Sequence, residues 1–190
     1  ISYETRDVKC LWVPLPNIFC CIIMGERHLI FLERQIPVMK SDYFHFMDEA
    51  IAEAKKAAVC GDVPVGAVVV RYDQIIGRGH NTKEFDKDPM GHGEIKAIAA
   101  AAAYLGQWRL SECTLFVTME PCPMCAGAIL QSRIERVVFG AWDVKWGAAG
   151  SKIDLFRPGL FNHEVALYGG IREKECRKLV EDFFASCRKK

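Results

Sequence analysis

The chain has 190 residues, of which 51% are hydrophobic and 26% charged, and its formal net charge is +1 at pH 7. This length allows one domain with a substantial core plus an extension, and the composition is ordinary for a globular protein. The charge balance does not by itself indicate a nucleic-acid-binding protein. It does not exclude nucleic-acid binding either, because a local basic face matters more for such binding than the total charge.

The N-terminal residues 1–38 differ from the rest of the chain. Prolines interrupt this segment and no regular period runs through it. Its apolar run 18–24 is far shorter than the roughly 20 residues of a membrane-spanning helix, and no clean signal-peptide cleavage site follows. Met39 then opens a segment that is typical of a domain start. We therefore expect residues 1–38 to be upstream sequence outside the functional domain, residues 39–190 to form that domain, and no membrane association.

The elements of residues 39–190 follow from the period of their apolar residues. Apolar side chains at helical spacing predict helices, short β-branched runs predict buried strands, and Gly, Pro and polar clusters predict loops. In chain order, the prediction is a helix over 42–59, strands over 65–70 and 74–79, a polar loop over 81–90, a helix over 92–105, a strand over 114–119, a helix over 122–131, a strand over 136–140, a loop over 141–159, a strand over 165–168 and a helix over 172–187. This alternation predicts an α/β sandwich around a mixed sheet.

The most informative motif is a histidine followed by two cysteines. His92 and, thirty residues later, Cys122 and Cys125 offer three zinc ligands, one short of a closed tetrahedral set. Structural zinc sites close with four protein ligands, whereas catalytic sites keep one position for water or substrate. Both parts of the motif fall at the starts of predicted helices, where the partial positive charge favours thiolates. The motif therefore predicts one zinc ion per chain in an open site.

Glu94 lies two residues after this histidine. In the first turn of a helix, a glutamate is ordinarily favoured by the helix dipole alone. Beside a zinc ligand, however, its carboxylate can take a proton from activated water and deliver it to a ring nitrogen and a leaving amine. His-x-Glu followed by Pro-Cys-x-x-Cys is the pattern of zinc-dependent nucleobase deaminases. We therefore expect hydrolytic deamination, with Glu94 as the catalytic acid–base group.

The nine cysteines do not predict a disulfide framework. Cys122 and Cys125 are assigned as ligands, and an odd number then remains. Free cysteines commonly pack as small hydrophobes, and this is the expectation for four that stand among apolar or helical neighbours, namely Cys60, Cys113, Cys176 and Cys187. This cysteine usage indicates a reducing, cytoplasmic compartment.

Residues 42–188 resemble the bacterial tRNA-specific adenosine deaminases, which convert the wobble adenosine of a tRNA anticodon to inosine. The resemblance is carried by DVPVGAVVV at 62–70, GHN at 79–81, MEPCPMCAGAIL at 119–130, SRIERVVFGA at 132–141 and D-x-K-x-GAAGS at 143–151. It implies a three-layer α/β/α, cytidine-deaminase-like fold, with a mixed central sheet and helices on both faces. It also implies a homodimer whose active site takes a base flipped out of the anticodon stem-loop of a tRNA.

The resemblance further implies which residues line the nucleoside pocket. Asn81 would contact the nucleoside, Val65 would wall the pocket, and the backbone N–H of Gly93 would be available to bond the base. Members of the family usually carry alanine where this chain has Gly93, and a small hydroxyl residue where it has Met90. Glycine costs about 1 kcal/mol relative to alanine in a helix interior and less near its start, whereas Met90 leaves the cap of that helix undefined.

Other implied contacts lie outside the pocket. Asp143 and Lys145 would lie on a loop that touches the nucleotides flanking the target base. Phe184, with Phe183, would lie near the site, although packing of the last helix against the core explains these two rings at least as well.

Two other functions are compatible with the sequence. A deaminase of free nucleobases or nucleosides, of the guanine or cytosine type, would carry the same zinc motif. The loop 143–151 and the basic residues near the C-terminus favour the tRNA substrate over this alternative. A non-enzymatic nucleic-acid-binding protein with structural zinc would need a fourth ligand, for which Cys113 is the nearby candidate, and it would have no use for Glu94.

Overall fold

The computed structural model describes residues 9–15, 18–25, 28–31 and 41–188, and the chain divides at residue 41 into two compact units. The first unit contains an antiparallel sheet in the order β1-β2-β3, made of β1 (Lys9–Leu15), β2 (Ile18–Gly25) and β3 (His28–Phe31). The sequence pattern predicted no element here. Pro14 lies in β1, which is an edge strand, and edge strands tolerate a residue without an N–H group.

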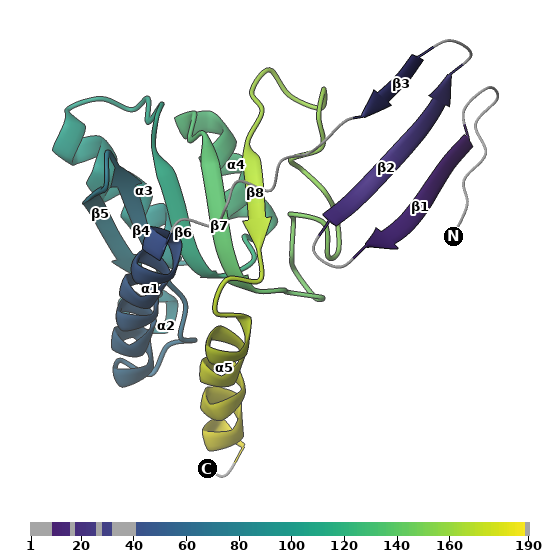
Figure 1. Ribbon diagram of the computed structural model, residues 1–190. Coiled ribbons are helices and arrows are strands. Elements are labelled where there is room, and N and C mark those ends of the chain that lie inside the picture. The colour runs from purple at the N-terminus through teal and green to yellow at the C-terminus, as the bar shows by residue number, and fades with distance from the viewer. Residues whose placement is uncertain (1–8, 16–17, 26–27, 32–40, 189–190) are drawn as a thin grey trace. The chain divides into compact units, whose positions relative to one another are not determined.

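The second unit is built on a mixed five-stranded sheet in the order β5-β4-β6-β7-β8. Its strands are β4 (Gly66–Arg71), β5 (Gln74–His80), β6 (Thr114–Met119), β7 (Arg136–Ala141) and β8 (Ala166–Gly169). β4 pairs antiparallel with β5 and β6, whereas β6, β7 and β8 are parallel. Helices cover both faces (Figure 1), with α1 (Ser41–Val59) and α5 (Glu173–Cys187) on one and α3 (Gly93–Leu105) and α4 (Pro123–Ser132) on the other. The three-layer α/β/α fold is confirmed.

Alternating side chains along the central strands build two separate cores. Successive residues of a strand point to opposite faces of the sheet, so a strand covered on both sides is apolar throughout. The core beneath α3 and α4 includes Ala67, Val69, Leu115, Val117, Val137, Phe139, Ala97, Ala101, Ala126 and Ile129. The core beneath α1 and α5 includes Val68, Val70, Phe116, Val138, Phe46, Met47, Ala50 and Cys176.

The helices and strands predicted for residues 39–190 are present, each with bounds within one residue of those predicted. A short helix, α2 (Lys83–Asp86), also lies in the segment predicted as a polar loop. The buried carboxyl group of Asp62 accepts hydrogen bonds from the N–H groups of Glu84 (2.9 Å) and Phe85 (3.0 Å). The first turn of α2 is thus stabilised by a residue about twenty positions upstream, which local patterns do not reveal. None of the helices in the described part of the chain has the length and hydropathy of a membrane span.

The strand ends define one edge of this sheet. Gly66 at the start of β4 pairs with His80 at the end of β5, and Met119 at the end of β6 pairs with Ala141 at the end of β7. The register of β4 with β6 places all four at the same edge. The segments that contain the predicted site residues begin or end there, and in open α/β sheets ligands bind beyond the carboxyl ends of the strands.

Close packing of α1 on β4 generates a prediction about stability. A Cβ atom at Gly66 would overlap the backbone of Ala50 and Ala54 in α1. Overpacking of this kind costs about 1–3 kcal/mol, so Gly66→Ala should lower the free energy of unfolding by that amount. Gly127→Ala is the matched control, since a Cβ there meets nothing within 4 Å in this chain. Denaturant unfolding of both variants checks this, and a Gly66→Ala midpoint equal to that of the parent would contradict the packing.

Candidate active site

Two helix N-termini bring the predicted metal ligands together. His92 immediately precedes α3 and Cys122 immediately precedes α4, both with extended backbone (φ −90°, ψ 143° and φ −74°, ψ 171°). Neither side chain makes a capping hydrogen bond to its own helix. Cys125 follows in the first turn of α4 and is fully buried. Because neither residue is used as a helix cap, the imidazole and the thiol are available as ligands.

The three ligand atoms are close enough to share one ion. The Nδ1 atom of His92 lies 3.7 Å from the Sγ atom of Cys122 and 3.5 Å from that of Cys125. All three ligand atoms lie within 4.8 Å of one another. Zinc binds nitrogen and sulfur at about 2.0–2.3 Å, so tetrahedral ligands lie roughly 3.5–3.8 Å apart. The cluster of His92, Cys122 and Cys125, called the metal cluster below, can therefore hold a metal ion.

Hydrogen bonding within the metal cluster favours a thiolate. The hydrogen bond with Cys125, followed by that with His92, lowers the pKa of Cys122 to about 4 despite burial. The same contact with Cys122 raises the pKa of His92 above its ordinary value. The hydrogen bond with Cys122, together with burial, raises the pKa of Cys125, so the two thiols share one proton. A thiolate is the form in which cysteine binds metals, and the pair provides one.

Glu94 lies in the first turn of α3, with 3% of the residue exposed. Its Oε2 atom is buried and has no hydrogen-bond partner among the described residues. Burial raises the pKa of this carboxyl group, which also interacts with the three residues of the metal cluster. A buried polar atom without a partner is rare in folded proteins. This environment fits a carboxyl group that transfers protons beside a bound metal ion. The metal-bound water and the substrate would then be the hydrogen-bond partners of the Oε2 atom.

Asn81, Val65 and Gly93 form one connected unit beside His92. The Oδ1 atom of Asn81 accepts a hydrogen bond from the N–H group of Gly93 at 2.9 Å, and the N–H group of Asn81 donates to the carbonyl of Val65 at 3.0 Å. Asn81 therefore accepts the hydrogen bond of the first free N–H group of α3. It provides the cap that the sequence, with Met90 in place of a small hydroxyl residue, left undefined. The same N–H group, expected from the sequence to be available to a base, is donated to Asn81 in this structure.

The loop that follows β7 contains Asp143 and Lys145. The Oδ1 atom of Asp143 accepts hydrogen bonds from the N–H groups of Lys145 (2.9 Å) and Trp146 (3.1 Å), so this side chain holds a turn. The side chain of Lys145 is exposed. The loop is connected to the ligand segment by a hydrogen bond of 2.8 Å from the N–H group of Ala148 to the carbonyl of Pro121.

Sequence reasoning missed Glu120 as a site residue. Its carboxyl group is buried and accepts three hydrogen bonds from the backbone of the loop after β7. The available signal was an acidic residue at the end of an apolar strand, immediately before Pro121 and Cys122.

The remaining predicted residues lie elsewhere. Phe184 is in α5 with 46% of the residue exposed, and its ring packs edge-to-face on Phe183 with centroids 5.5 Å apart. Among the other cysteines, Cys113 and Cys176 are buried as expected, and the six cysteines within residues 41–188 are all free. Cys60 and Cys187 are exposed instead, because they lie where α1 and α5 end.

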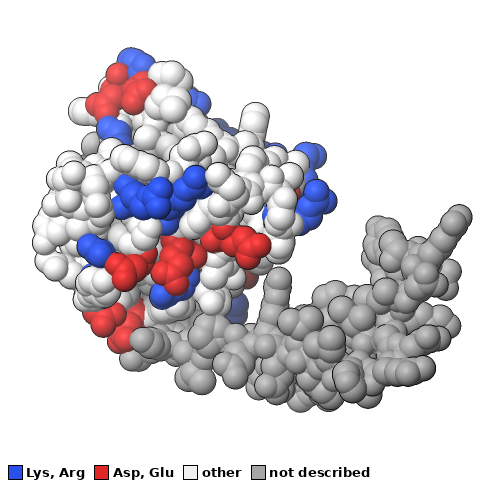
Figure 2. All heavy atoms as spheres, turned by 90° about the horizontal axis from the view of Figure 1, so that it is seen from above, with Lys and Arg blue, Asp and Glu red and all other residues white. Residues whose placement is uncertain are grey.

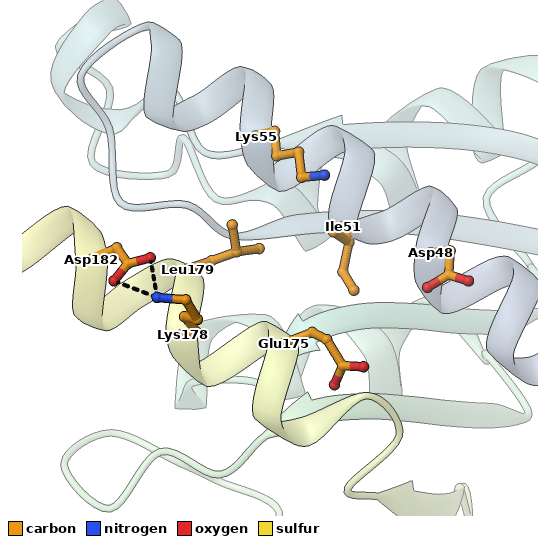
Figure 3. A pocket seen from close by; sticks show the side chains of 7 residues that line it. All are labelled: Asp48, Ile51, Lys55, Glu175, Lys178, Leu179 and Asp182. Atoms are coloured by element: carbon orange, nitrogen blue, oxygen red, sulfur yellow. Dashed lines mark hydrogen bonds and ion pairs between the residues drawn. The ribbon is translucent and has the colours of Figure 1, made fainter.

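A groove of about 360 Å³ lies between α1 and α5 and belongs to a different part of the unit (Figure 3). It is lined by Asp48, Ile51, Lys55, Glu175, Lys178, Leu179 and Asp182. The amino group of Lys178 pairs with the carboxyl group of Asp182 across one turn of α5. None of the candidate site residues lines this groove, so it has no connection to the chemistry of the metal cluster.

Known proteins share both the sequence and the fold. The model of the MafB19-like deaminase family matches residues 41–188. A tRNA-specific adenosine deaminase of Bacillus subtilis is 48% identical over 145 residues, which cover 76% of this chain and 90% of that protein. A protein of the same name from Streptococcus pyogenes is 39% identical over 155 residues, which cover 82% and 98%.

Solved structures of deaminases are also similar to this chain. A structure from a study of A-to-I editing by tRNA:A34 deaminases at the wobble position has a TM-score of 0.69 and 40% identity, covering 71% of this chain and 98% of that one. The chain therefore belongs to the MafB19-like deaminases and, with these relatives, to the tRNA-specific adenosine deaminases. A guanine deaminase of Nitrosomonas europaea, at 22% identity and a TM-score of 0.66 over 75% of this chain and 84% of that one, shares the fold. The family and the deaminase class predicted from the sequence are confirmed.

The metal cluster predicts a specific metal dependence. Cys125→Ser should lose bound metal and unfold more easily, because a site assembled on folding couples metal binding to stability. Cys187→Ser is the control, since this exposed cysteine lies outside the cluster. Elemental analysis after dialysis checks the metal content of both variants. A full equivalent of metal in Cys125→Ser would refute the ligand assignment.

Proposed function

We propose that this chain hydrolytically deaminates adenosine to inosine at the wobble position of a tRNA anticodon. The observation that carries the proposal is the buried carboxyl group of Glu94 beside the metal cluster. This arrangement occurs in a chain that is 48% identical to a tRNA-specific adenosine deaminase. The 40% identity with a structure from work on tRNA:A34 deaminases supports the wobble position as the target.

We propose zinc as the metal, with one ion per chain held by His92, Cys122 and Cys125. Imidazole and thiolate ligands suit zinc, and three protein ligands are the number found in catalytic zinc sites. Bound there, zinc would supply Lewis-acid activation of water. The partnerless Oε2 atom of Glu94 fits a neighbouring polar group of this kind.

Glu94 performs the proton transfers in this mechanism. Its carboxylate takes a proton from the attacking water, whose oxygen forms a bond to C6 of the adenine ring. The protonated carboxyl then delivers that proton to N1 of the ring. The carboxylate then takes the proton of the new C6 hydroxyl group and delivers it to the amine. The C6–N6 bond breaks, the C6 carbonyl forms and ammonia leaves, so that adenosine and water yield inosine and ammonia. Burial raises the pKa of Glu94, which helps it to hold a proton between transfers.

The substrate contacts follow from the residues at the same sheet edge. Val65 and Asn81 are almost fully buried and are hydrogen-bonded to each other, so they offer a rigid wall and an amide group to the nucleoside. Gly93 packs closely against this wall, since a Cβ atom there would lie 3.2 Å from the carbonyl oxygen of Val65. Asp143 and Lys145 lie on the loop proposed to meet the flanking nucleotides. Phe184, exposed in α5, would contact the same substrate.

The organisation of the protein is part of the proposal. We assign residues 39–190 as the functional domain and place residues 1–38 outside it. The family match over residues 41–188 supports this division. We also propose a homodimer that works in the cytoplasm, where its tRNA substrate would be found, and sedimentation of the purified protein tests the dimer.

Replacing the acid–base group tests its role. Glu94→Gln should keep the metal and the fold but lower kcat by roughly 10²–10⁴-fold, the usual contribution of a general acid–base group. Glu135→Gln, whose side chain is 52% exposed, is the matched control and should behave as the parent. Single-turnover deamination with metal analysis checks both variants. A Glu94→Gln rate within tenfold of the parent would assign the proton transfers to another group.

Substrate size tests the function itself. An anticodon stem-loop already splays its bases, which reduces the unstacking cost of a few kcal/mol, and flanking nucleotides add contacts that a free nucleoside lacks. We expect wobble inosine in a stem-loop, with kcat/KM far above that for adenosine. Figure 2 shows basic and acidic groups interleaved on the face seen from above. Added salt should weaken binding, because it screens contacts between basic side chains and phosphate. Equal processing of free adenosine, guanine or cytosine would replace this function with small-molecule deamination.

A further inference from the structure

Glu120 is a buried acidic residue that the mechanism above does not use. It has 3% of its surface exposed, at the end of β6 and two residues before the ligand Cys122. Its Oε2 atom accepts a hydrogen bond from the N–H group of Asp143 at 2.9 Å. Its Oε1 atom accepts two more, from the N–H groups of Ala149 (2.9 Å) and Ser151 (3.0 Å). Burying a carboxyl group is costly unless such partners are present, so its placement and the shape of this loop depend on each other.

The loop also contacts the Glu120 segment at other points. The N–H group of Glu120 donates to the carbonyl of Ala141 at 2.8 Å, and that of Ala148 donates to the carbonyl of Pro121 at 2.8 Å. A Cβ atom at Gly147 would overlap the Glu120 carboxyl group. The backbone of residues 143–151 thus surrounds the side chain of Glu120. Its hydrogen bond to Pro121 also fixes it next to the segment that contains Cys122.

The same loop directs large side chains outward. Val144 is 75% exposed and Trp146 is 68% exposed, with the exposed side chain of Lys145 between them. An indole ring offers a stacking surface to any nucleobase, and an ammonium group attracts phosphate. A loop whose backbone is already ordered loses less conformational entropy on binding than a mobile one. The hydrogen bonds of Glu120 therefore act on a surface suited to single-stranded RNA.

We propose that Glu120 is a positioning residue for the RNA substrate. It holds residues 143–151 in the conformation that receives the nucleotides next to the target adenosine, and it fixes this loop relative to Cys122. Glu120 acts through the loop and touches neither the reacting base nor the metal. The inference rests on the proposed function and adds a determinant of RNA affinity that is separate from the catalytic group.

The variant Glu120→Gln tests this inference. Glutamine keeps the size of the side chain, but its NH₂ group must face at least one of the three N–H donors. We expect KM for the anticodon stem-loop to rise roughly tenfold, about 1.4 kcal/mol, with kcat within threefold of the parent and unchanged metal content. Glu135→Gln is the matched control. An unchanged KM, or a loss confined to kcat, would overturn the proposal.

Gly147→Ala disturbs the contact between the loop and Glu120 from the loop side. It is a second test that remains available if Glu120→Gln folds poorly. It should raise KM in the same way. Combining the two substitutions should raise KM little beyond the larger single effect, because changes to one contact are not additive. Additive effects would show that the two residues act independently and would contradict the proposal.

Amide hydrogen exchange of the protein without RNA separates this inference from the proposed function. The N–H groups of Asp143, Ala149 and Ser151 should exchange faster in Glu120→Gln than in the parent. Unchanged exchange would overturn the ordering role of Glu120 whatever the substrate is. Failure of the parent itself to form inosine would instead overturn the proposed function, and the exchange data would still decide whether Glu120 orders the loop.

Discussion

The site depends on the convergence of two helix N-termini at one edge of the sheet. His92 precedes α3 and Cys122 precedes α4. The ends of β5 and β6, the strands before them in the chain, lie at the same edge of the sheet on either side of β4. Parallel pairing of β6 with β7 adds the loop after β7 at the same edge. His92 and Cys122, which are thirty residues apart in the sequence, thereby have their ligand atoms 3.7 Å apart. The same arrangement buries Glu94, which lies in the first turn of α3.

The buried polar groups around the metal cluster have two different roles. Glu94 has a buried oxygen without a hydrogen-bond partner in the described part of the chain, which suits a group that exchanges protons with ligands. Asn81 and Glu120 are also buried, but their acceptor atoms are used by backbone N–H groups of α3 and of the loop after β7. The first residue is therefore free for chemistry, whereas the other two fix backbone that surrounds the chemistry. Such satisfied partners keep a site in its working geometry.

The sequence predicted what depends on local pattern. Central strands such as β6 were found because residues buried on both faces are continuously apolar. The three residues of the metal cluster were predicted from spacing within a motif, and the fold brings them together. The missed features are non-local. α2 depends on Asp62, some twenty residues upstream, and the role of Glu120 depends on N–H groups more than twenty residues downstream. No period or spacing encodes those pairings, so only the folded chain reveals them.

An open metal site has three protein ligands, and X-ray absorption at the zinc edge tests for this number most directly. Two sulfur ligands, one imidazole nitrogen and one further light-atom ligand from solvent are predicted for the zinc-loaded protein. A third sulfur or a second imidazole in the coordination sphere would contradict the account, because the site would then be closed by protein and structural in kind.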